Sequence, residues 1–163
     1  MITVRPARPD DEQALGRIDA LTWTSDVSPS PTTEADRPFF GPGTAIDDVL
    51  VAEDDGSVVG YVKVHQPLPL PSHTHVLEIG GLAVDPERQR VGAGRALVDA
   101  AVGLARARGA RKLSLRVLGP NAPARALYEA SGFRVEGVLV DEFFLAGRYV
   151  DDVLMARDIS PAE

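Results

Sequence analysis

The chain has 163 residues, of which 44% are hydrophobic and 25% charged, and it carries a formal net charge of −7. This length and composition predict one globular domain over residues 1–163 and exclude a disordered, collagenous or coiled-coil chain. The chain has no cysteine, which excludes a disulfide scaffold, thiolate zinc sites and cysteine nucleophiles. Because the sequence also lacks a run of about 18 apolar residues, we expect a soluble, cytoplasmic protein with no membrane partner.

The charge is distributed unevenly along the chain. Residues 86–134 contain 10 basic and 3 acidic side chains, although the whole chain has 17 basic and 24 acidic residues. A basic segment within an acidic chain favours a small anionic ligand over a long nucleic acid, which selects a broadly basic surface. A solvated helix face is the alternative explanation. We therefore expect no nucleic-acid partner.

The N-terminal part of the chain predicts a strand followed by a helix. Residues 2–5 alternate apolar and polar side chains, as a short strand does. In the helix that follows, Leu15, Ile18 and Leu21 fall on one face. Residues 22–46 are interrupted by Ser, Thr, Pro and Gly, and we expect helix pieces and loop there.

The next part of the chain predicts a hairpin, a loop and a further strand. Residues 49–52 and 58–64 are rich in β-branched side chains and are separated by an Asp-Gly pair, which favours a tight turn. The proline-rich residues 66–71 predict an exposed extended loop, because proline cannot donate to a sheet ladder. Residues 76–84 then predict another strand.

The rest of the chain predicts two helices and three strands. Apolar residues recur at helical spacing over 92–108, and side chains alternate over 113–117 as in a strand. A short helix is expected over residues 121–131, with an Asn at its N-cap. Residues 133–145 and 149–155 predict two strands joined by a glycine-containing turn.

A glycine-containing turn connects the strand at 76–84 to the helix at 92–108. The first turn of a helix leaves N–H groups unsatisfied and carries partial positive charge, and Gly92 and Gly94 have no side chains to keep an anion away from these donors. The turn therefore predicts an anion site, to which Arg88, Arg90 and Arg95 add positive charge. The alternative is that the glycines only permit a tight turn and close helix packing.

Two familiar phosphate-binding motifs do not fit this turn. A Walker loop needs a lysine after the glycines, and the two lysines of this chain are Lys63 and Lys112. A dinucleotide-binding fingerprint needs a third glycine, but Leu97 stands at that position.

The segment Gln89-Arg90-Val91-Gly92-Ala93-Gly94 resembles the [RQ]-x-x-G-x-[GA] motif of the GCN5-related N-acetyltransferase (GNAT) family. Its flanks are also similar to that family, with Leu-Ala-Val-Asp-Pro at 82–86 and Asn-Ala-Pro-Ala-Arg-Ala-Leu-Tyr-Glu-Ala-Ser-Gly-Phe at 121–133. The resemblance covers residues 76–133. It implies an α/β fold in which helices flank a mixed, mostly antiparallel sheet with two splayed parallel strands.

The same resemblance implies acetyl-CoA as the acetyl donor, bound between the strand that ends near Val84 and the strand at 113–118. The pantetheine arm would contact main-chain atoms, and backbone N–H groups from about residue 90 to 95 would bind the pyrophosphate. The expected cofactor-binding residues are Leu82, Ala83, Val84, Gln89, Arg90, Val91, Gly92, Ala93, Gly94, Arg95, Asn121 and Tyr128.

Tyr128 and Glu78 are the expected catalytic residues. In the family a tyrosine at the position of Tyr128 donates a proton to the sulfur of coenzyme A, and some members keep a general-base glutamate at the position of Glu78. A packed aromatic and an exposed strand carboxylate are the alternatives for these two residues. His65, His73 and His75 are the other possible bases, but too few further ligands lie near them to predict a metal site.

The resemblance thus predicts an N-acetyltransferase that acts on a primary amine, either a small amine or a protein N-terminus. Because the chain has no cysteine, we expect direct transfer in a ternary complex. A non-catalytic acyl-CoA binding or sensor domain is the alternative, and association into a homodimer stays open. We expect residues 22–46, 66–75 and 141–149 to border the acceptor, and their acidic side chains favour a cationic amine.

Overall fold

A computed structural model describes residues 1–24, 26–30, 38–89 and 92–161 of the chain. Its strands are β1 (Ile2–Pro6), β2 (Val49–Asp54), β3 (Ser57–His65), β4 (Val76–Val84), β5 (Lys112–Leu118), β6 (Arg134–Leu145) and β7 (Arg148–Asp158). Its α-helices are α1 (Glu12–Thr22), α2 (Ala93–Ala107) and α3 (Ala122–Ala130). Short 3₁₀ turns lie at Pro9–Asp11, Ile46–Asp48, Pro71–His73 and Pro86–Arg88.

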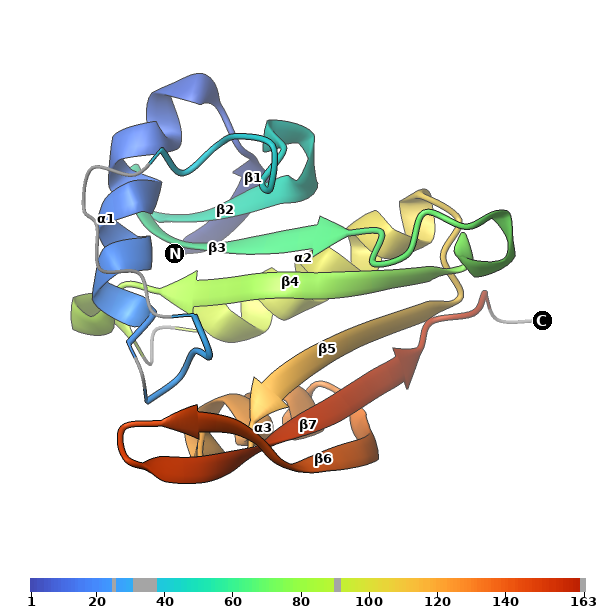
Figure 1. Ribbon diagram of the computed structural model, residues 1–163. Coiled ribbons are helices and arrows are strands. Elements are labelled where there is room, and N and C mark those ends of the chain that lie inside the picture. The colour runs from blue at the N-terminus through green and yellow to red at the C-terminus, as the bar shows by residue number, and fades with distance from the viewer. Residues whose placement is uncertain (25, 31–37, 90–91, 162–163) are drawn as a thin grey trace.

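The strands form one seven-stranded sheet in the order β1-β2-β3-β4-β5-β7-β6. Among the described residues β4 and β5 are the parallel pair, and the other neighbouring strands run antiparallel. In Figure 1 α1 lies in front of the sheet, with α2 and α3 behind it. The expected mixed, mostly antiparallel sheet flanked by helices is confirmed.

The hairpin and the long helix agree with their sequence signals. Asp55 and Gly56 connect β2 to β3 with φ angles of 50° and 80°, the left-handed conformation that an Asp-Gly pair tolerates in a two-residue turn. Gly92 is the N-cap of α2 at φ 87°, and Gly109 follows the helix at φ 85°. Two details differ from the prediction: β7 is longer than 149–155, and Leu21 is 50% exposed rather than buried with its helix face.

The expected irregular segment 22–46 is described in part. Residue 25 and residues 31–37 lie outside the described residues. Gly41 and Thr44 form an isolated antiparallel bridge, and a 3₁₀ turn begins at Ile46. Glu12 holds this segment against α1, because its carboxylate accepts the N–H of Phe39 at 2.6 Å and that of Phe40 at 3.2 Å.

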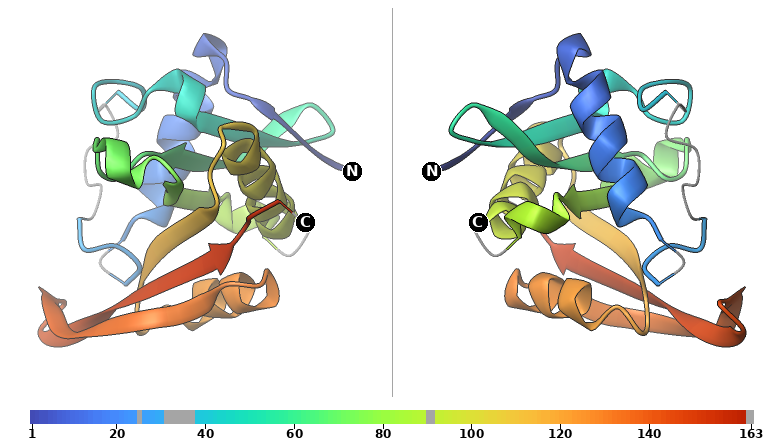
Figure 2. Two further views of the ribbon diagram at one scale, coloured as in Figure 1. Left: turned by 90° about the vertical axis from the view of Figure 1, so that its right-hand side faces the viewer. Right: turned by 90° about the vertical axis from the view of Figure 1, so that its left-hand side faces the viewer.

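Two apolar cores stabilise opposite faces of the sheet. The right-hand view of Figure 2 shows α1 and α2 on the two sides of the strands. Burial of apolar side chains against each face fixes both helices to the sheet. The α1 side buries Leu15, Ile18, Val49, Val51, Tyr61 and Ala83. The α2 side buries, among others, Val62, Val64, Leu97, Val98, Ala101, Leu113 and Leu115.

The parallel pair separates halfway along its length. The register runs from Val76 opposite Lys112 to Ile79 opposite Leu115 and then stops, although both strands continue. Gly80 is an extra residue in β4, because Lys63 pairs with Gly81 while the next residue of β3 pairs with Ile79. A Cβ at Gly80 would lie 2.7 Å from the His65 ring, so a larger residue at this bulge would displace the His65 side chain. Figure 1 shows β4 and β5 diverging beyond this point.

Asp85 fixes the chain where it leaves β4. Its N–H donates to the carbonyl of Val59 at 2.8 Å, its carboxylate accepts the N–H of Glu87 at 3.0 Å, and it pairs with Arg17 of α1. Burial opposes ionisation of this carboxyl group, but the Glu87 N–H and the Arg17 guanidinium outweigh it and hold the pKa of Asp85 below its ordinary value. Asp85 therefore ties α1 to the start of the glycine-containing turn.

The Asp85→Asn variant tests this tie. We expect it to be about 1.5–3 kcal/mol less stable than wild type at neutral pH, because a charged hydrogen-bonding partner is lost. The ionised carboxylate stabilises the fold above its ordinary pKa of 3.8, and that stabilisation is lost as the pH falls through the lower pKa of the folded state. Denaturant unfolding should therefore show the difference from wild type shrinking below about pH 4. Asp10→Asn, at an exposed site, is the control, and a difference independent of pH would contradict the assignment.

Candidate functional site

The separation of β4 and β5 opens a cleft of about 1420 Å³ through the middle of the molecule. It is bordered by the end of α1, residues 38–44, the second half of β4, the start of α2, the end of β5 and the first turns of α3. Secondary structure elements from both faces of the sheet therefore meet in one space.

The start of α2 presents backbone donors to this cleft. Gly92 accepts the first helical bond, from the N–H of Ala96 at 3.1 Å, so the N–H groups at 93–95 have no acceptor within the helix. Gln89, Gly92, Gly94 and Arg95 line the cleft, whereas the side chain of Ala93 is buried away from it. Arg90 and Val91 lie outside the described residues.

The two glycines of the motif have different structural roles. Gly92 needs its left-handed φ of 87° and has open space around it, as an anion-binding turn requires. A Cβ at Gly94 would lie 3.2 Å from Leu127 in α3, so this glycine permits close packing of α2 against α3. The packing alternative considered for the glycines therefore applies to Gly94.

Most basic side chains of residues 86–134 form ion pairs or hydrogen bonds with other groups of the protein. The ion pairs are Arg88 with Asp54 at 3.9 Å, Arg108 with Asp48 at 3.0 Å, Lys112 with Glu136 at 2.6 Å and Arg116 with Asp152 at 3.2 Å. Arg95 donates to the Ala130 carbonyl at 3.1 Å. Arg95 and Arg116 are the described basic residues of the segment that line the cleft. One anionic ligand therefore does not account for the whole charge excess.

Asn121 and Tyr128 reach the cleft from α3. The Asn121 side chain caps the helix by accepting the N–H of Ala124 at 3.3 Å, and Tyr128 follows two turns later. The Tyr128 ring packs edge-on against Phe133 with centroids 5.9 Å apart. Burial raises the pKa of Tyr128 to about 12, so its hydroxyl group is a proton donor at neutral pH. The residue is both a packed aromatic and a cleft-lining donor.

The second half of β4 offers main-chain groups on its open edge. Leu82, Ala83 and Val84 pair with β3 on one side, whereas pairing with β5 has already ended at Ile79. Backbone N–H and C=O groups along this edge are free to bind an extended ligand. All three residues line the cleft.

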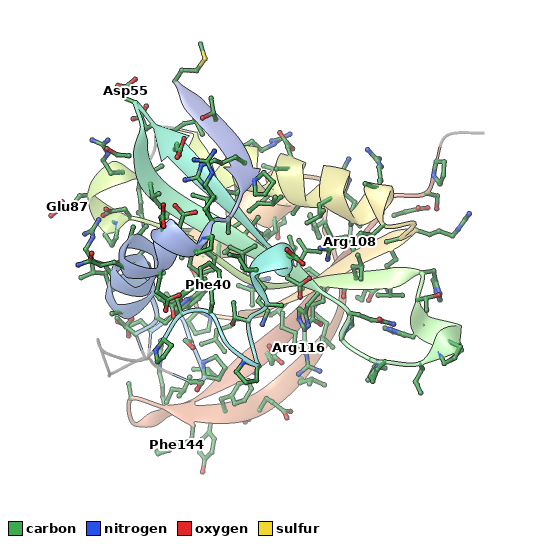
Figure 3. All side chains as sticks on the ribbon, turned by 90° about the horizontal axis from the view of Figure 1, so that it is seen from above. Phe40, Asp55, Glu87, Arg108, Arg116 and Phe144 are labelled. Atoms are coloured by element: carbon green, nitrogen blue, oxygen red, sulfur yellow. The ribbon has the colours of Figure 1, made fainter. Side chains whose placement is uncertain are left out.

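Glu78, Arg116 and Asp152 line the floor of the cleft on the α1 side, and His65 lies beside Glu78. We call these four side chains the polar row. His65 Nε2 lies 3.3 Å from Glu78 Oε1, and Arg116 Nη1 lies 3.2 Å from Asp152 Oδ2. Glu78 is therefore a partly buried, paired carboxylate rather than an exposed strand residue. In Figure 3, seen from above, Arg116 lies on the same side of the sheet as Phe40 and α1, opposite α2.

An aromatic wall stands beside the polar row. Trp23 Nε1 donates to Tyr61 Oη at 2.8 Å, and the Tyr61 hydroxyl donates to Asp19 of α1. Phe39 packs edge-on against Tyr61 with centroids 4.9 Å apart. Burial, together with the Asp19 carboxylate, raises the pKa of Tyr61 well above its ordinary value. This network keeps the Trp23 and Tyr61 rings fixed at the cleft.

The other predicted candidates lie elsewhere. His73 and His75 lie in and just after the 3₁₀ turn before β4, with ring centroids 6.2 Å apart. In the part of the chain that the structure describes, no group of three His, Asp or Glu side chains is arranged to hold a metal ion. Nor does any described helix have the length and apolarity to cross a membrane. The sequence analysis missed Arg116 and Asp152, because only the register of β5 with β7 brings them together.

Comparisons with known proteins agree with this geometry. Residues 14–133 match the acetyltransferase (GNAT) family model. The chain is 57% identical over 85 residues to a mycothiol acetyltransferase of Beutenbergia cavernae, which covers 52% of this chain and 27% of that protein. It is 40% identical over 132 residues to a mycothiol acetyltransferase of Amycolatopsis mediterranei, with 76% of this chain and 42% of that protein covered.

A solved structure adds a comparison of the fold. A Salmonella typhimurium protein solved with its cofactor acetyl-CoA superposes with a TM-score of 0.79 at 22% identity, covering 100% of this chain and 96% of that one. By contrast, the chain spans less than half the length of the two mycothiol acetyltransferases. The family match covers most of this chain, whereas the Salmonella likeness concerns the fold.

Proposed function

The chain belongs to the GNAT acetyltransferase family, and from this premise we propose that it transfers the acetyl group of acetyl-CoA to a primary amine. The observation that supports this most strongly is the meeting of three features in one cleft. These are the open edge of β4, the donor-rich start of α2 and the Tyr128 hydroxyl group.

The residues present fit acetyl-CoA as the donor. The N–H groups after Gly92 suit a pyrophosphate, because a helix N-terminus favours anions. The open edge from Leu82 to Val84 suits an amide-containing arm that binds like an added strand. When bound, acetyl-CoA supplies the activated acetyl group as a thioester.

Tyr128 is proposed to stabilise the departing thiolate. With a pKa of about 12, its hydroxyl group stays protonated and can donate to sulfur. Complete proton transfer to a thiolate is uphill, since a thiol has a reference pKa of about 8.5. A hydrogen bond that strengthens as negative charge develops on sulfur therefore supplies most of the effect.

Glu78 is proposed to accept the proton of the attacking amine, directly or through water. An alkylamine with a pKa near 10.4 is almost entirely protonated at neutral pH, so a base must act before attack. Glu78 lines the cleft beside the opening between β4 and β5, and His65 Nε2 lies 3.3 Å from one of its carboxylate oxygens. With no cysteine in the chain, we propose direct transfer in a ternary complex.

The acceptor is proposed to approach from the α1 side of the sheet, past Trp23, Phe39 and the polar row. A small amine or a protein N-terminus fits the chemistry. The curated relatives are named for mycothiol, but they are more than twice as long as the aligned part of this chain. A cytoplasmic location and association into a homodimer stay predictions.

The proposed function is tested with a panel of amines and detection of released thiol. Wild-type protein with acetyl-CoA should release thiol only when an acceptor amine is added. Acetyl-CoA binding without amine-dependent release across alkylamines, aminoglycosides and peptides would instead assign the chain to the non-catalytic acyl-CoA binding class.

The Gly92→Asp variant tests the anion site. An aspartate at this position keeps the left-handed turn accessible but brings negative charge to the N–H groups of α2. We expect its affinity for coenzyme A to fall at least tenfold below that of Gly92→Asn, which adds the same bulk without the charge. Isothermal calorimetry measures both. Equal affinity of the two variants, with circular dichroism unchanged, would show that the pyrophosphate does not bind at this turn.

The Tyr128→Phe variant tests the proton donor. Phenylalanine keeps the ring contact with Phe133 and removes only the hydroxyl group. We expect kcat to fall about 100-fold, while the Kd for acetyl-CoA changes less than twofold, because the hydrogen bond acts mainly in the transition state. Steady-state kinetics and calorimetry separate the two effects. Wild-type turnover in this variant would leave Tyr128 a packing residue only.

The Glu78→Gln variant tests the base. We expect kcat/KM at pH 7 to fall at least tenfold and to recover in part toward pH 9, as free amine becomes available in solution. Glu129→Gln, on the exposed side of α3, is the control. Rates equal to wild type from pH 6 to 9 would transfer the role to His65 or to bulk solvent.

A further inference from the structure

Asp152 is a buried carboxylate that the proposed chemistry does not use. Its residue is only 2% exposed, yet it lines the cleft. One oxygen, Oδ2, accepts a hydrogen bond from Arg116 Nη1 at 3.2 Å. The neighbouring Asp151 points to the other face of β7 and accepts the N–H of Asp141 at 2.9 Å.

The position of Asp152 in the sheet places it across β5 from Glu78. In the register of β7 with β5, Asp152 lies opposite Leu118, beyond the point where β4 and β5 separate. Glu78 pairs with Ser114, on the other side of β5 and on the same face. Two carboxylates therefore flank the opening from opposite sides, one on β4 and one on β7.

The surroundings of Asp152 do not balance its charge. Arg116 on β5 is its one described cationic partner, and that side chain is 56% exposed to solvent. Glu142 on β6 and Glu78 on β4 add further negative charge nearby. Burial raises the pKa of Asp152, and these two glutamates raise it further against the opposing effect of Arg116. An arrangement that costs folding free energy in this way indicates a binding role for the group.

We propose that Asp152 binds the ammonium group of the acceptor in the cleft and so selects cationic alkylamines. This inference rests on the proposed function and deepens it. The cationic group would lie between Asp152 and Glu78, and its proton would pass to the Glu78 carboxylate, leaving a neutral amine to attack and a protonated Glu78. Amines that carry a carboxylate beside the nitrogen are selected against, because the Asp152 and Glu78 carboxylates both line this space.

The test compares Asp152→Asn with Asp151→Asn. Asparagine keeps the volume of the side chain and can still accept from Arg116, and Asp151→Asn makes the same change on the opposite face of the strand. The probes are butylamine, 1,4-diaminobutane and alanylalanine amide, and their binding is measured by calorimetry without acetyl-CoA. For each probe that wild type binds, we expect the affinity of Asp152→Asn to be at least tenfold lower than that of wild type. The affinity of Asp151→Asn should equal that of wild type.

Two further readouts separate binding from a structural role. With an active amine, Asp152→Asn should raise KM at least tenfold and change kcat much less, with the Kd for acetyl-CoA unchanged. Its unfolding midpoint at pH 7.5 should be no lower than that of wild type. The pKa of Asp152 is raised in the folded protein, so ionisation of this carboxyl group destabilises the fold of the wild type at that pH. A lower midpoint with KM unchanged, equal probe affinity in both proteins, or no probe binding by wild type would overturn the proposal.

Failure of the proposed function looks different from failure of this inference. If the chain is not an acetyltransferase, wild type releases no thiol with any amine, and the calorimetric comparison of the probes still tests Asp152. If the chain is an acetyltransferase and Asp152 is not the ammonium site, amine-dependent release occurs with the same KM in wild type and in Asp152→Asn.

Discussion

The separation of β4 from β5 after Ile79 and Leu115 is the constraint on which the site depends. A sheet normally satisfies its backbone groups on both sides of a central strand, so two central strands that part leave donors and acceptors open in the middle of the protein. The bulge at Gly80, where a Cβ would collide with His65, marks the place at which the parting begins. The cleft, the open edge of β4 and the approach to Tyr128 all follow from it.

Two buried aspartates differ in their effect on the fold: one stabilises it, and the other is proposed to bind a ligand. Asp85 has an N–H donor and an arginine, its pKa is held low, and it fixes the turn that leads to α2. Asp152 is also buried and also pairs with a half-exposed arginine, but Glu78 and Glu142 add negative charge near it, and its pKa is raised. The first carboxylate stabilises the fold when ionised, whereas the second is costly when ionised and sits in the cleft. This contrast supports a binding role for Asp152.

The sequence predicts local features well and long-range ones poorly. The strand at 76–84 and the helix that begins after Gly92 depend on neighbours in the chain, and both are confirmed. The role of Gly94 could not be read in the same way, since it depends on Leu127, thirty-three residues later. Asp152 escaped prediction for a similar reason. In Asp151-Asp152 either residue could face the cleft, and only the register with β5 decides between them.

The same difference applies to the two proposed substrates: the donor site is built from residues close together in the sequence, and the acceptor site from residues far apart. The proposed pyrophosphate site consists of backbone N–H groups in one short turn, so it depends little on side chains from distant parts of the chain. The proposed acceptor side instead combines α1, the segment near Phe39, β4, β5 and β7, whose side chains meet only in the folded protein. On this proposal, we expect substitutions at Trp23, Arg116 or Asp152 to change acceptor binding without affecting the turn. The substrate is therefore better inferred from the charge of this floor than from the family motif.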